Sequence, residues 1–462
     1  MRKTNRRQFL SSAASAASFL LVPRYVLGGR GYVPPSDQVQ VALVGAGGRG
    51  RENVRDLLNL PDVRVTCIAD PAAHWDLNRF YYRTSAGLEP VREMVEKHYA
   101  ENASPGQVKG YADFREMLAR ENSLDAVLCA TPDHLHAYVS ILSMRAGKHV
   151  YCEKPLTHNI YEARLVGKLA AESGLATQLG NQLHSTPTIR NAVEYLRSGV
   201  IGAVREVHSW VPATRWNVGL KEVPKEGETP PKGLDWDLWT GPRAMRPFHG
   251  LYAPVTWRDF WDFGLGALGD FGCHDLDAAV WGLDLGLPES IQVFPAGFGN
   301  ADIIPYGEIG YFSFPGKSSS QPLQLTWYSG GLLPNKPDQI PEDFRFARRG
   351  AMYIGEKGVM VTGNGPKPRL FPEGKIDPTI TYTLPPTMGH HRDWIDAIKG
   401  GPKPSSPFEY GAHLTEITLL GVLSLRLGSE RIRWDAEKMK AKGLPQADAY
   451  IRESVRQGWT LD

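Results

Sequence analysis

The chain has 462 residues, of which 42% are hydrophobic and 22% are charged. This is ordinary globular composition, with enough apolar material for two or three domains. The formal net charge of +2 gives no reason to expect nucleic acid or an anionic membrane surface as a partner.

The first segment has the pattern of an export signal. The stretch "TNRRQFL" contains the pair Arg6 and Arg7, and a short Ala/Ser-rich apolar stretch (residues 11–22) follows it. That stretch is shorter than the roughly 20 apolar residues of a membrane-spanning helix, and no other stretch is a better candidate for a span. Residues 1–35 are therefore predicted to be a signal for the twin-arginine export machinery plus a linker, which implies a periplasmic location. A frayed basic N-terminus is the alternative.

The four cysteines, Cys67, Cys129, Cys152 and Cys273, could form disulfides in an oxidising periplasm. However, the first three lie in apolar runs that are typical of buried strands. Buried free thiols are therefore the prediction. No CxxC or Cys/His spacing suggests zinc, and we expect no metal site.

The next segment, residues 36–157, has the pattern of a dinucleotide-binding domain. Val39–Val44 is an apolar, β-branched run, typical of a strand buried on both faces. Gly45, Gly47 and Gly50 follow as G-x-G-x-x-G at the start of a helix. Glycines there permit a tight turn, close approach of the backbone to a pyrophosphate, and tight packing of helix on strand. Further alternation of strands and helices predicts a doubly wound α/β domain of the Rossmann type.

The next strand ends in Asp70, which follows Gly45 by 25 residues. This is near the interval expected for the carboxylate that binds the adenosine ribose. Such a carboxylate accepts hydrogen bonds from the ribose hydroxyls and repels a 2′-phosphate. No arginine follows it in "DPAAH", so we expect NAD, with NADP as the less favoured alternative.

The remaining residues, 158–462, are predicted to form a C-terminal domain. Six tryptophans crowd into its first part, and core packing is the ordinary explanation for them: Trp210, Trp216, Trp236, Trp239, Trp257 and Trp261. Trp257 and Arg258 lie closest to the stretch discussed next and are candidate substrate contacts. Past Ser290, the runs "SIQVFPAGF", "IGYFSF" and "LQLTWY" predict sheet strands, and helices are expected at "HHRDWIDAIKG" and at residues 410–427.

Asp270, His274 and Asp277 are spaced four and then three residues apart in "GALGDFGCHDLD". In a helix this spacing puts all three on one face. Such a face could hold a metal, move a proton, or pair a buried histidine with a carboxylate. The spacing alone does not decide among these roles.

Five motifs occur in an order that resembles the glucose–fructose oxidoreductase and inositol dehydrogenase family (Gfo/Idh/MocA): "VALVGAGGRG", "ATPDHLHA", "AGKHVYCEKPL", "SGVIGAVREV" and "GALGDFGCHDLD". The resemblance implies an N-terminal Rossmann domain followed by an α/β domain with a large open, mostly antiparallel sheet. In the family that sheet often forms the oligomer interface, so a homo-oligomer is expected.

The resemblance also implies residue roles. Lys154 of "CEKP" would stabilise negative charge on a substrate oxygen, His274 would act as general base and Asp270 would orient the substrate or the imidazole, without a metal. Asp277 is expected to be helical and structural. A cis peptide is expected before Pro155. The predicted cofactor contacts are Gly45, Gly47, Gly48, Arg49, Gly50, Asp70, Thr131, Pro132, His136, Glu153, Lys154 and Gln182.

Four further positions have alternative interpretations. His134 and His136 are expected to pack or cap around the cofactor rather than to act as catalysts. Asn181 and His184, in "GNQLH", are candidate substrate contacts, with a plain loop as the alternative.

The expected activity is NAD-dependent oxidation of a secondary alcohol of a sugar, glycoside or cyclitol. The alternative is an NAD-dependent glycoside hydrolase or lyase that works through transient oxidation of a ring carbon, since one fold hosts both. A protein that binds the cofactor without catalysis fits poorly, because Lys154, Asp270 and His274 are all present.

Overall fold

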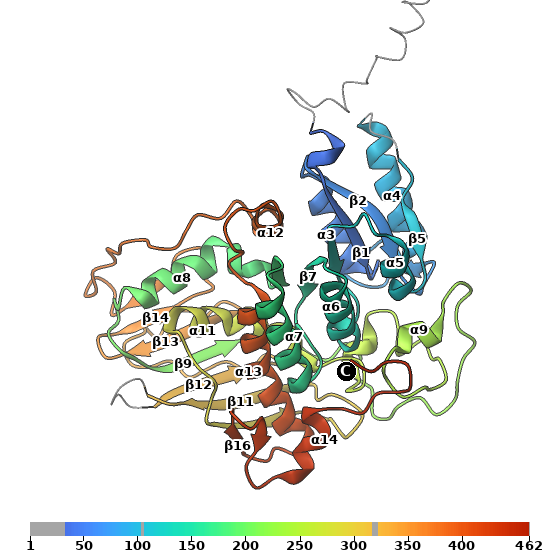
Figure 1. Cartoon of the computed structure of the whole chain (residues 1–462). Helices are drawn as coiled ribbons and strands as arrows, with labels where there is room; N and C mark the ends of the chain where they lie inside the picture. The colour runs from blue at the N-terminus through green and yellow to red at the C-terminus, as the bar shows by residue number, and fades with distance from the viewer. Residues whose placement is uncertain (1–32, 103–105, 317–321, 462) are drawn as a thin grey trace, which may run out of the picture.

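The computed structural model describes residues 33–102, 106–316 and 322–461 (Figure 1). The predicted twin-arginine motif at Arg6 and Arg7 lies outside the described residues. Among the helices that are described, none combines the length and apolarity needed to cross a bilayer.

The first sheet has six parallel strands in the order β5-β2-β1-β6-β7-β8. Because central strands of such a sheet are covered on both faces, they are apolar along their whole length. The strands are β1 (Val39–Val44), β2 (Val63–Ala69), β5 (Lys109–Tyr111), β6 (Ala126–Cys129), β7 (His149–Glu153) and β8 (Thr177–Gly180).

The sheet extends beyond the expected domain boundary at residue 157. After β7 the chain crosses back through a helix, α7, and β8 then pairs with β7 in parallel. The first domain therefore includes residues up to Gly180. Its helices lie on both faces of the sheet: α3 (Gly48–Leu58), α4 (Leu88–Glu101), α5 (Phe114–Arg120), the 3-10 turn η2 (Asp133–Leu135), α6 (His136–Arg145) and α7 (Ile160–Ser173). A short 3-10 turn, η1 (Pro35–Asp37), precedes β1.

The second sheet has nine strands in the order β15-β14-β13-β9-β12-β11-β10-β16-β17. Within this second sheet, the β9–β12 pair is the only parallel one among the described strands, so the expected large and mostly antiparallel sheet is confirmed. The strands are β9 (Val204–Trp210), β10 (Ser290–Ala296), β11 (Gly307–Phe314), β12 (Leu323–Tyr328), β13 (Gly350–Gly355), β14 (Val359–Val361), β15 (Arg369–Phe371), β16 (Ile432–Asp435) and β17 (Lys440–Ala441).

Helices cover one face of this second sheet (Figure 1). The other face is covered by residues 340–346 over β9, β13, β14 and β15, and it is open at β10 and β11. On the helix-covered face, Val293 and Phe312 are fully buried, whereas Phe294 and Tyr311 alternate with them and are 39% and 45% exposed on the open face. The covering helices are α8 (Pro187–Arg197), α10 (Gly266–Asp275), α11 (Asp277–Leu283) and α13 (Phe408–Arg426). The 3-10 turn η5 (Pro445–Ala447) and the short helix α14 (Asp448–Ile451) follow the hairpin of β16 and β17 at the edge of the domain.

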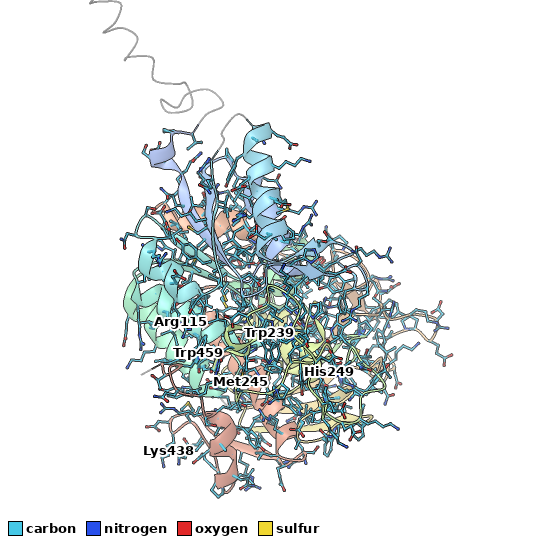
Figure 2. The ribbon with its side chains drawn as sticks, turned by 90° about the vertical axis from the view of Figure 1, so that its right-hand side faces the viewer. Arg115, Trp239, Met245, His249, Lys438 and Trp459 are labelled. Atoms are coloured by element: carbon cyan, nitrogen blue, oxygen red, sulfur yellow. The ribbon has the colours of Figure 1, made fainter. Side chains whose placement is uncertain are left out.

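Two helices join the domains, and both lie where helices were predicted. Helix α13 packs along α7 of the first domain, where a Cβ on Gly167 would lie 2.8 Å from Ala412 Cβ. Helix α12 (His390–Ile398) inserts the fully buried Trp394 into the core of the first domain. The C-terminal tail also returns to this domain, and Figure 2 shows Trp459 beside Arg115, whose guanidinium lies 4.2 Å from the indole ring centroid.

A third apolar core joins two segments that are far apart in the sequence. One is the hairpin of β3 (Trp75–Asp76) and β4 (Ser85–Ala86), and the other is the insert of residues 211–265, with α9 (Trp236–Thr240) and η4 (Thr256–Asp259). The Ala73 amide donates to the Gly233 carbonyl at 2.8 Å. Figure 2 places Trp239 of the insert at the middle of the molecule. Five of the six clustered tryptophans are at most 7% exposed, but Trp216 is 41% exposed.

The prediction of free thiols is confirmed for the described chain. Cys67, Cys129, Cys152 and Cys273 are all buried and none forms a disulfide. Cys129 and Cys152 stand opposite each other on the neighbouring strands β6 and β7.

Candidate active site

A cavity of about 740 Å³ opens at the carboxyl ends of β1, β2, β6 and β7, where ligands bind in doubly wound sheets. Helix α10 and the insert close its other side. Most of the predicted site residues line it: Gly45, Gly47, Gly48, Arg49, Asp70, Thr131, Pro132, His136, Glu153, Lys154, Gln182, Trp257, Arg258, Asp270 and His274.

The glycine loop has the shape that a pyrophosphate requires. Gly45 has φ 91°, and a Cβ there would lie 2.6 Å from the Ala130 backbone. Gly50 packs against the Gly45 carbonyl oxygen, only 2.0 Å from where a Cβ would be. Gly47 in contrast has open space where its Cβ would be, at the start of α3. The loop therefore turns tightly, packs the helix on the strand and leaves room for phosphate at the amide groups of the helix N-terminus.

Asp70 is placed at the end of β2, where the cavity begins. Its two carboxylate oxygens accept hydrogen bonds from the amides of Ala46, at 2.6 Å, and Ala72, at 2.8 Å. Burial raises the pKa of Asp70 to about 6, although these two amides oppose the shift. Asp70 thus fixes the glycine loop and also lies at the position expected for a ribose contact.

Glu153, at the end of β7, is held by three donors. Its Oε1 accepts hydrogen bonds from Asn53 at 2.7 Å, Gln182 at 2.7 Å and the Arg49 guanidinium at 3.1 Å. Burial alone would raise the pKa of Glu153, but the Arg49 charge and the Asn53 hydrogen bond outweigh it and lower the pKa. This carboxylate therefore ties α3, with its phosphate loop, to the strand that carries Lys154.

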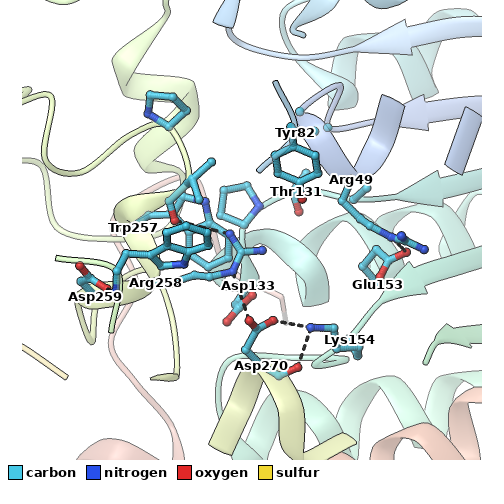
Figure 3. Close-up of a pocket in the computed structure, with 18 of the residues that line it drawn as sticks. Arg49, Tyr82, Thr131, Asp133, Glu153, Lys154, Trp257, Arg258, Asp259 and Asp270 are labelled. Atoms are coloured by element: carbon cyan, nitrogen blue, oxygen red, sulfur yellow. Dashed lines mark hydrogen bonds and ion pairs between the residues drawn. The ribbon is translucent and has the colours of Figure 1, made fainter. Parts of the chain in front are cut away.

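Lys154 and Asp270 form the centre of the site (Figure 3). The Lys154 ammonium donates to the Asp270 backbone carbonyl at 2.5 Å and forms an ion pair with the Asp270 carboxylate. Arg258 Nε lies 3.6 Å from the other carboxylate oxygen, and its guanidinium lies over the Trp257 ring at 4.0 Å. Burial alone would raise the pKa of Asp270, but the charges of Lys154 and Arg258 lower it to about 2. The peptide bond between Lys154 and Pro155 is cis, as expected.

His274 lies one turn beyond Asp270 on α10, so the helical spacing predicted from the sequence is confirmed for this pair. Its Nδ1 is buried and has no hydrogen-bond partner among the described residues. Burial and the charges of Lys154 and Arg349 lower the pKa of His274 well below 6.5. The imidazole is therefore neutral at pH 7 and able to accept a proton.

The structure does not bring Asn181 and His184 into the cavity. Both are fully buried, and His184 Nδ1 lies 2.8 Å from Asp277 Oδ2. Asn181 donates to the same carboxylate at 3.3 Å, and Tyr410 donates to it at 2.5 Å. Asp277, the first residue of α11, has the structural role that was predicted for it. Gly50 also lies outside the cavity lining, because its role is packing.

The two histidines of "ATPDHLHA" are both buried. His134 Nε2 pairs with the Trp239 carbonyl at 2.9 Å and packs against the insert. The His136 ring lies between the carbonyls of Pro155, at 2.6 Å, and Thr131, at 2.8 Å, so it connects the two loops that line the cavity. Both placements agree with packing roles around the cofactor site.

Several charged residues of the cavity were not singled out from the sequence, among them Asp133 and Arg349. Asp133 begins η2, is 5% exposed and points toward Asp270 and Arg258 (Figure 3). Burial raises its pKa to about 7, with the Asp270 charge adding to the shift and the Arg258 charge opposing it. Asp133 belongs to the "ATPDHLHA" motif, and its carboxylate in that motif could have marked it as a site residue. Arg349 is held by Asp275 at 2.6 Å, and no local pattern marks it.

Asp270 and His274 do not belong to a cluster of three or more potential metal ligands among the described residues. The one such cluster there is Cys129, His136 and Cys152. Both ring nitrogens of His136 already contact carbonyl oxygens. The absence of a catalytic metal stays a prediction.

The fold and the cavity together define a two-domain protein with a dinucleotide site facing a lysine, an aspartate and a histidine. Comparison with known families agrees: residues 39–181 match the NAD-binding Rossmann fold of the Gfo/Idh/MocA oxidoreductase family, and residues 195–295 match its C-terminal α/β domain. The chain belongs to this family. Its first domain is thus an NAD-binding domain, which confirms the cofactor predicted from the glycine loop and Asp70.

Individual relatives are distant. The 4-carboxy-2-hydroxymuconate-6-semialdehyde dehydrogenase of Sphingobium sp. is 30% identical over 150 residues, 32% of this chain and 40% of that protein. A glycosyl hydrolase family 109 protein of Shewanella pealeana is 27% identical over 273 residues, 55% of each chain. The chain therefore spans about half the length of these curated relatives.

Among solved structures, the WlbA dehydrogenase from Bordetella pertussis, in complex with NADH and UDP-GlcNAcA, has the same fold. Its TM-score is 0.55 at 18% identity, with 86% of this chain and 99% of that chain covered. At this identity the likeness shows the fold alone.

Proposed function

We propose that the protein is an NAD-dependent oxidoreductase that acts on a secondary alcohol of a sugar, glycoside or cyclitol. The observation that carries the proposal is the convergence of Lys154, Asp270 and His274 in the cavity that the glycine loop opens into. Carbohydrate as the substrate class is supported by the name of one relative, a glycosyl hydrolase family 109 protein.

NAD, when bound, accepts a hydride from the alcohol carbon. The chain's own residues handle the hydroxyl group. The Lys154 ammonium donates a hydrogen bond to the alcohol oxygen and stabilises the negative charge that develops there. The neutral His274 imidazole takes the hydroxyl proton, and the low pKa of Asp270 keeps this carboxylate ionised so that it holds the lysine in place.

The experiment is to incubate the purified protein, with NAD supplied, with a panel of sugars, glycosides and cyclitols and to follow nicotinamide absorbance. Reduction by one compound class supports the proposal and identifies the substrate. The proposal is contradicted if the protein binds NAD but none of these compounds reduces the bound NAD. A Lys154→Met variant serves as the matched control, since it removes the ammonium and keeps much of the side-chain volume.

A second candidate is redox-neutral glycoside cleavage through transient oxidation. Asp133 favours it, because its pKa of about 7 leaves a protonated carboxyl available near Asp270 to protonate a departing glycosidic oxygen. The glycosyl hydrolase relative points the same way. Cleavage of a chromogenic glycoside without net NADH formation would establish this reaction, and net NADH formation without cleavage would exclude it.

We also propose export and self-association. The pair Arg6 and Arg7 supports export to the periplasm by the twin-arginine machinery, which fractionation of cells expressing a double Arg→Lys variant tests.

Phe294 and Tyr311, exposed on the open face of the second sheet, support a homo-oligomer. Sedimentation of wild type and a Tyr311→Glu variant tests it, with a monomeric wild type as the contrary result.

A further inference from the structure

Trp216 is unlike the other tryptophans of the insert. Core packing explains Trp210, Trp236, Trp239, Trp257 and Trp261, because each is at most 7% exposed. Trp216 is 41% exposed and lines the cavity. A large exposed aromatic side chain at the edge of a ligand cavity requires an explanation other than the core.

The partner of Trp216 comes from the other domain. Tyr81, in the loop of the β3–β4 hairpin, is 61% exposed and stacks on Trp216 with ring centroids 5.8 Å apart and an interplanar angle of 17°. Phe80 meets the Trp216 ring edge-on at 5.9 Å. Tyr81 and Trp216 both line the cavity that contains Lys154 and Asp270. We name this pair the aromatic platform.

The platform is fixed relative to the catalytic residues. Asp259 accepts hydrogen bonds from the backbone amides of Trp216, at 2.8 Å, and Asn217, at 2.7 Å. Asp259 directly follows Arg258, which contacts Asp270. On the other side, the Tyr82 ring packs so closely on the glycine loop that a Cβ on Gly48 would lie 2.4 Å from it. Both halves of the platform are thus anchored to elements that form the reaction site.

We propose that the aromatic platform is a subsite for a second sugar ring, so that the substrate is a glycoside or oligosaccharide rather than a free monosaccharide. This proposal rests on the proposed oxidoreductase function. Pyranose rings present C–H groups on their faces, and these pack on flat aromatic rings, while hydroxyl groups at the ring edge stay in water. An exposed pair of nearly parallel rings, continuous with the catalytic cavity, suits a sugar ring attached to the one being oxidised.

The test compares matched sugars on wild-type protein and on Trp216→Ala. Glucose is compared with cellobiose and maltose, and galactose with lactose, by reduction of nicotinamide. Losing the indole is expected to raise KM for the disaccharides about tenfold and to leave KM for the monosaccharides and kcat for both within about twofold. Tyr81→Ala is expected to act in the same direction, and Trp216→Phe to restore part of the loss.

The control is Tyr382→Ala, which removes an aromatic side chain that is 54% exposed and does not line the cavity. Equal changes for monosaccharides and disaccharides, or no change with either platform variant, would overturn the proposal. If no sugar reduces the nicotinamide, the oxidoreductase proposal fails, and calorimetric titration with cellobiose and maltose still decides the subsite. Disaccharide binding that Trp216→Ala abolishes supports it, and absence of binding to wild type refutes it.

Discussion

Replacing His274 with alanine separates an acid–base role of this imidazole from a structural one. The hydride step is expected to slow by about a hundredfold or more, the range of a positioned acid–base group. A hundredfold corresponds to about 2.7 kcal/mol of transition-state stabilisation. NAD affinity is expected to stay within about twofold, since the predicted cofactor contacts lie on other elements. Single-turnover reduction of nicotinamide measures the rate, and equilibrium titration measures the affinity.

The variant is also expected to fold. His274 Nδ1 is buried without a hydrogen-bond partner among the described residues, and an unpaired buried polar atom costs about 1–3 kcal/mol. Alanine removes that atom and breaks no hydrogen bond there, so the free energy of unfolding should change by less than about 1 kcal/mol. Chemical denaturation checks this. His249→Ala is the control, because that histidine lies in the insert and does not line the cavity.

The pH profile gives an independent readout. Because the pKa of His274 lies well below 6.5, the imidazole is neutral at pH 7 and is protonated only at lower pH. The wild-type rate should be flat near neutrality and fall on the acid side, and His274→Ala should lose that acid limb. An unchanged rate or an unchanged acid limb would refute the base role. A response of the wild-type rate to zinc or a chelator would reinstate the metal interpretation.

Three further substitutions test neighbouring parts of the site. Lys154→Met should lower kcat by about a hundredfold, because the ammonium stabilises the negative charge that develops on the alcohol oxygen; steady-state kinetics checks this. Gly47→Ala should fold normally, since its Cβ meets nothing within 4 Å. Its affinity for NAD should fall about tenfold, because the methyl group crowds the pyrophosphate, and titration measures this. If glycoside cleavage occurs, it should decline as the pH rises through about 7, where Asp133 loses its proton, and Asp133→Asn should abolish cleavage while sparing alcohol oxidation.

Much of the first domain could be predicted from the sequence, because its signals are local. The dinucleotide-binding loop needs spaced glycines, an apolar strand before them and an acidic residue after the next strand. The sequence shows all three, with Asp70 as the acidic residue. The Asp270–His274 pair could be placed on a helix for the same reason, since the period of 3.6 residues is a short-range property. The end of the domain could not be predicted in this way, because β8 joins the sheet by pairing with β7 after a crossover helix.

The rest of the site depends on contacts between distant segments. Arg349 comes from the approach to β13 and reaches the cavity through its ion pair with Asp275. Tyr82 belongs to a polar-looking segment of the first domain and meets Gly48 through a hairpin whose core is completed by the insert. Neither position has a neighbour in sequence that signals its role. Periodicity and motif spacing cannot reveal such contacts, because they encode neighbours along the chain only.

His184 and His274 show why residue type and helical spacing leave the role of a histidine open. The spacing of Asp270, His274 and Asp277 left three interpretations open, one of which was a core histidine paired with a carboxylate. That description fits His184 instead. Its Nδ1 contacts Asp277, and its ring stacks on Trp281 with centroids 4.0 Å apart. His274 has a different environment: it lines the cavity, and two cations, Lys154 and Arg349, disfavour its protonation. His184 is fully buried outside the cavity lining and is held by Asp277, so its role is structural. The position of each ring relative to the cavity, rather than its spacing in the sequence, therefore favours His274 as the base.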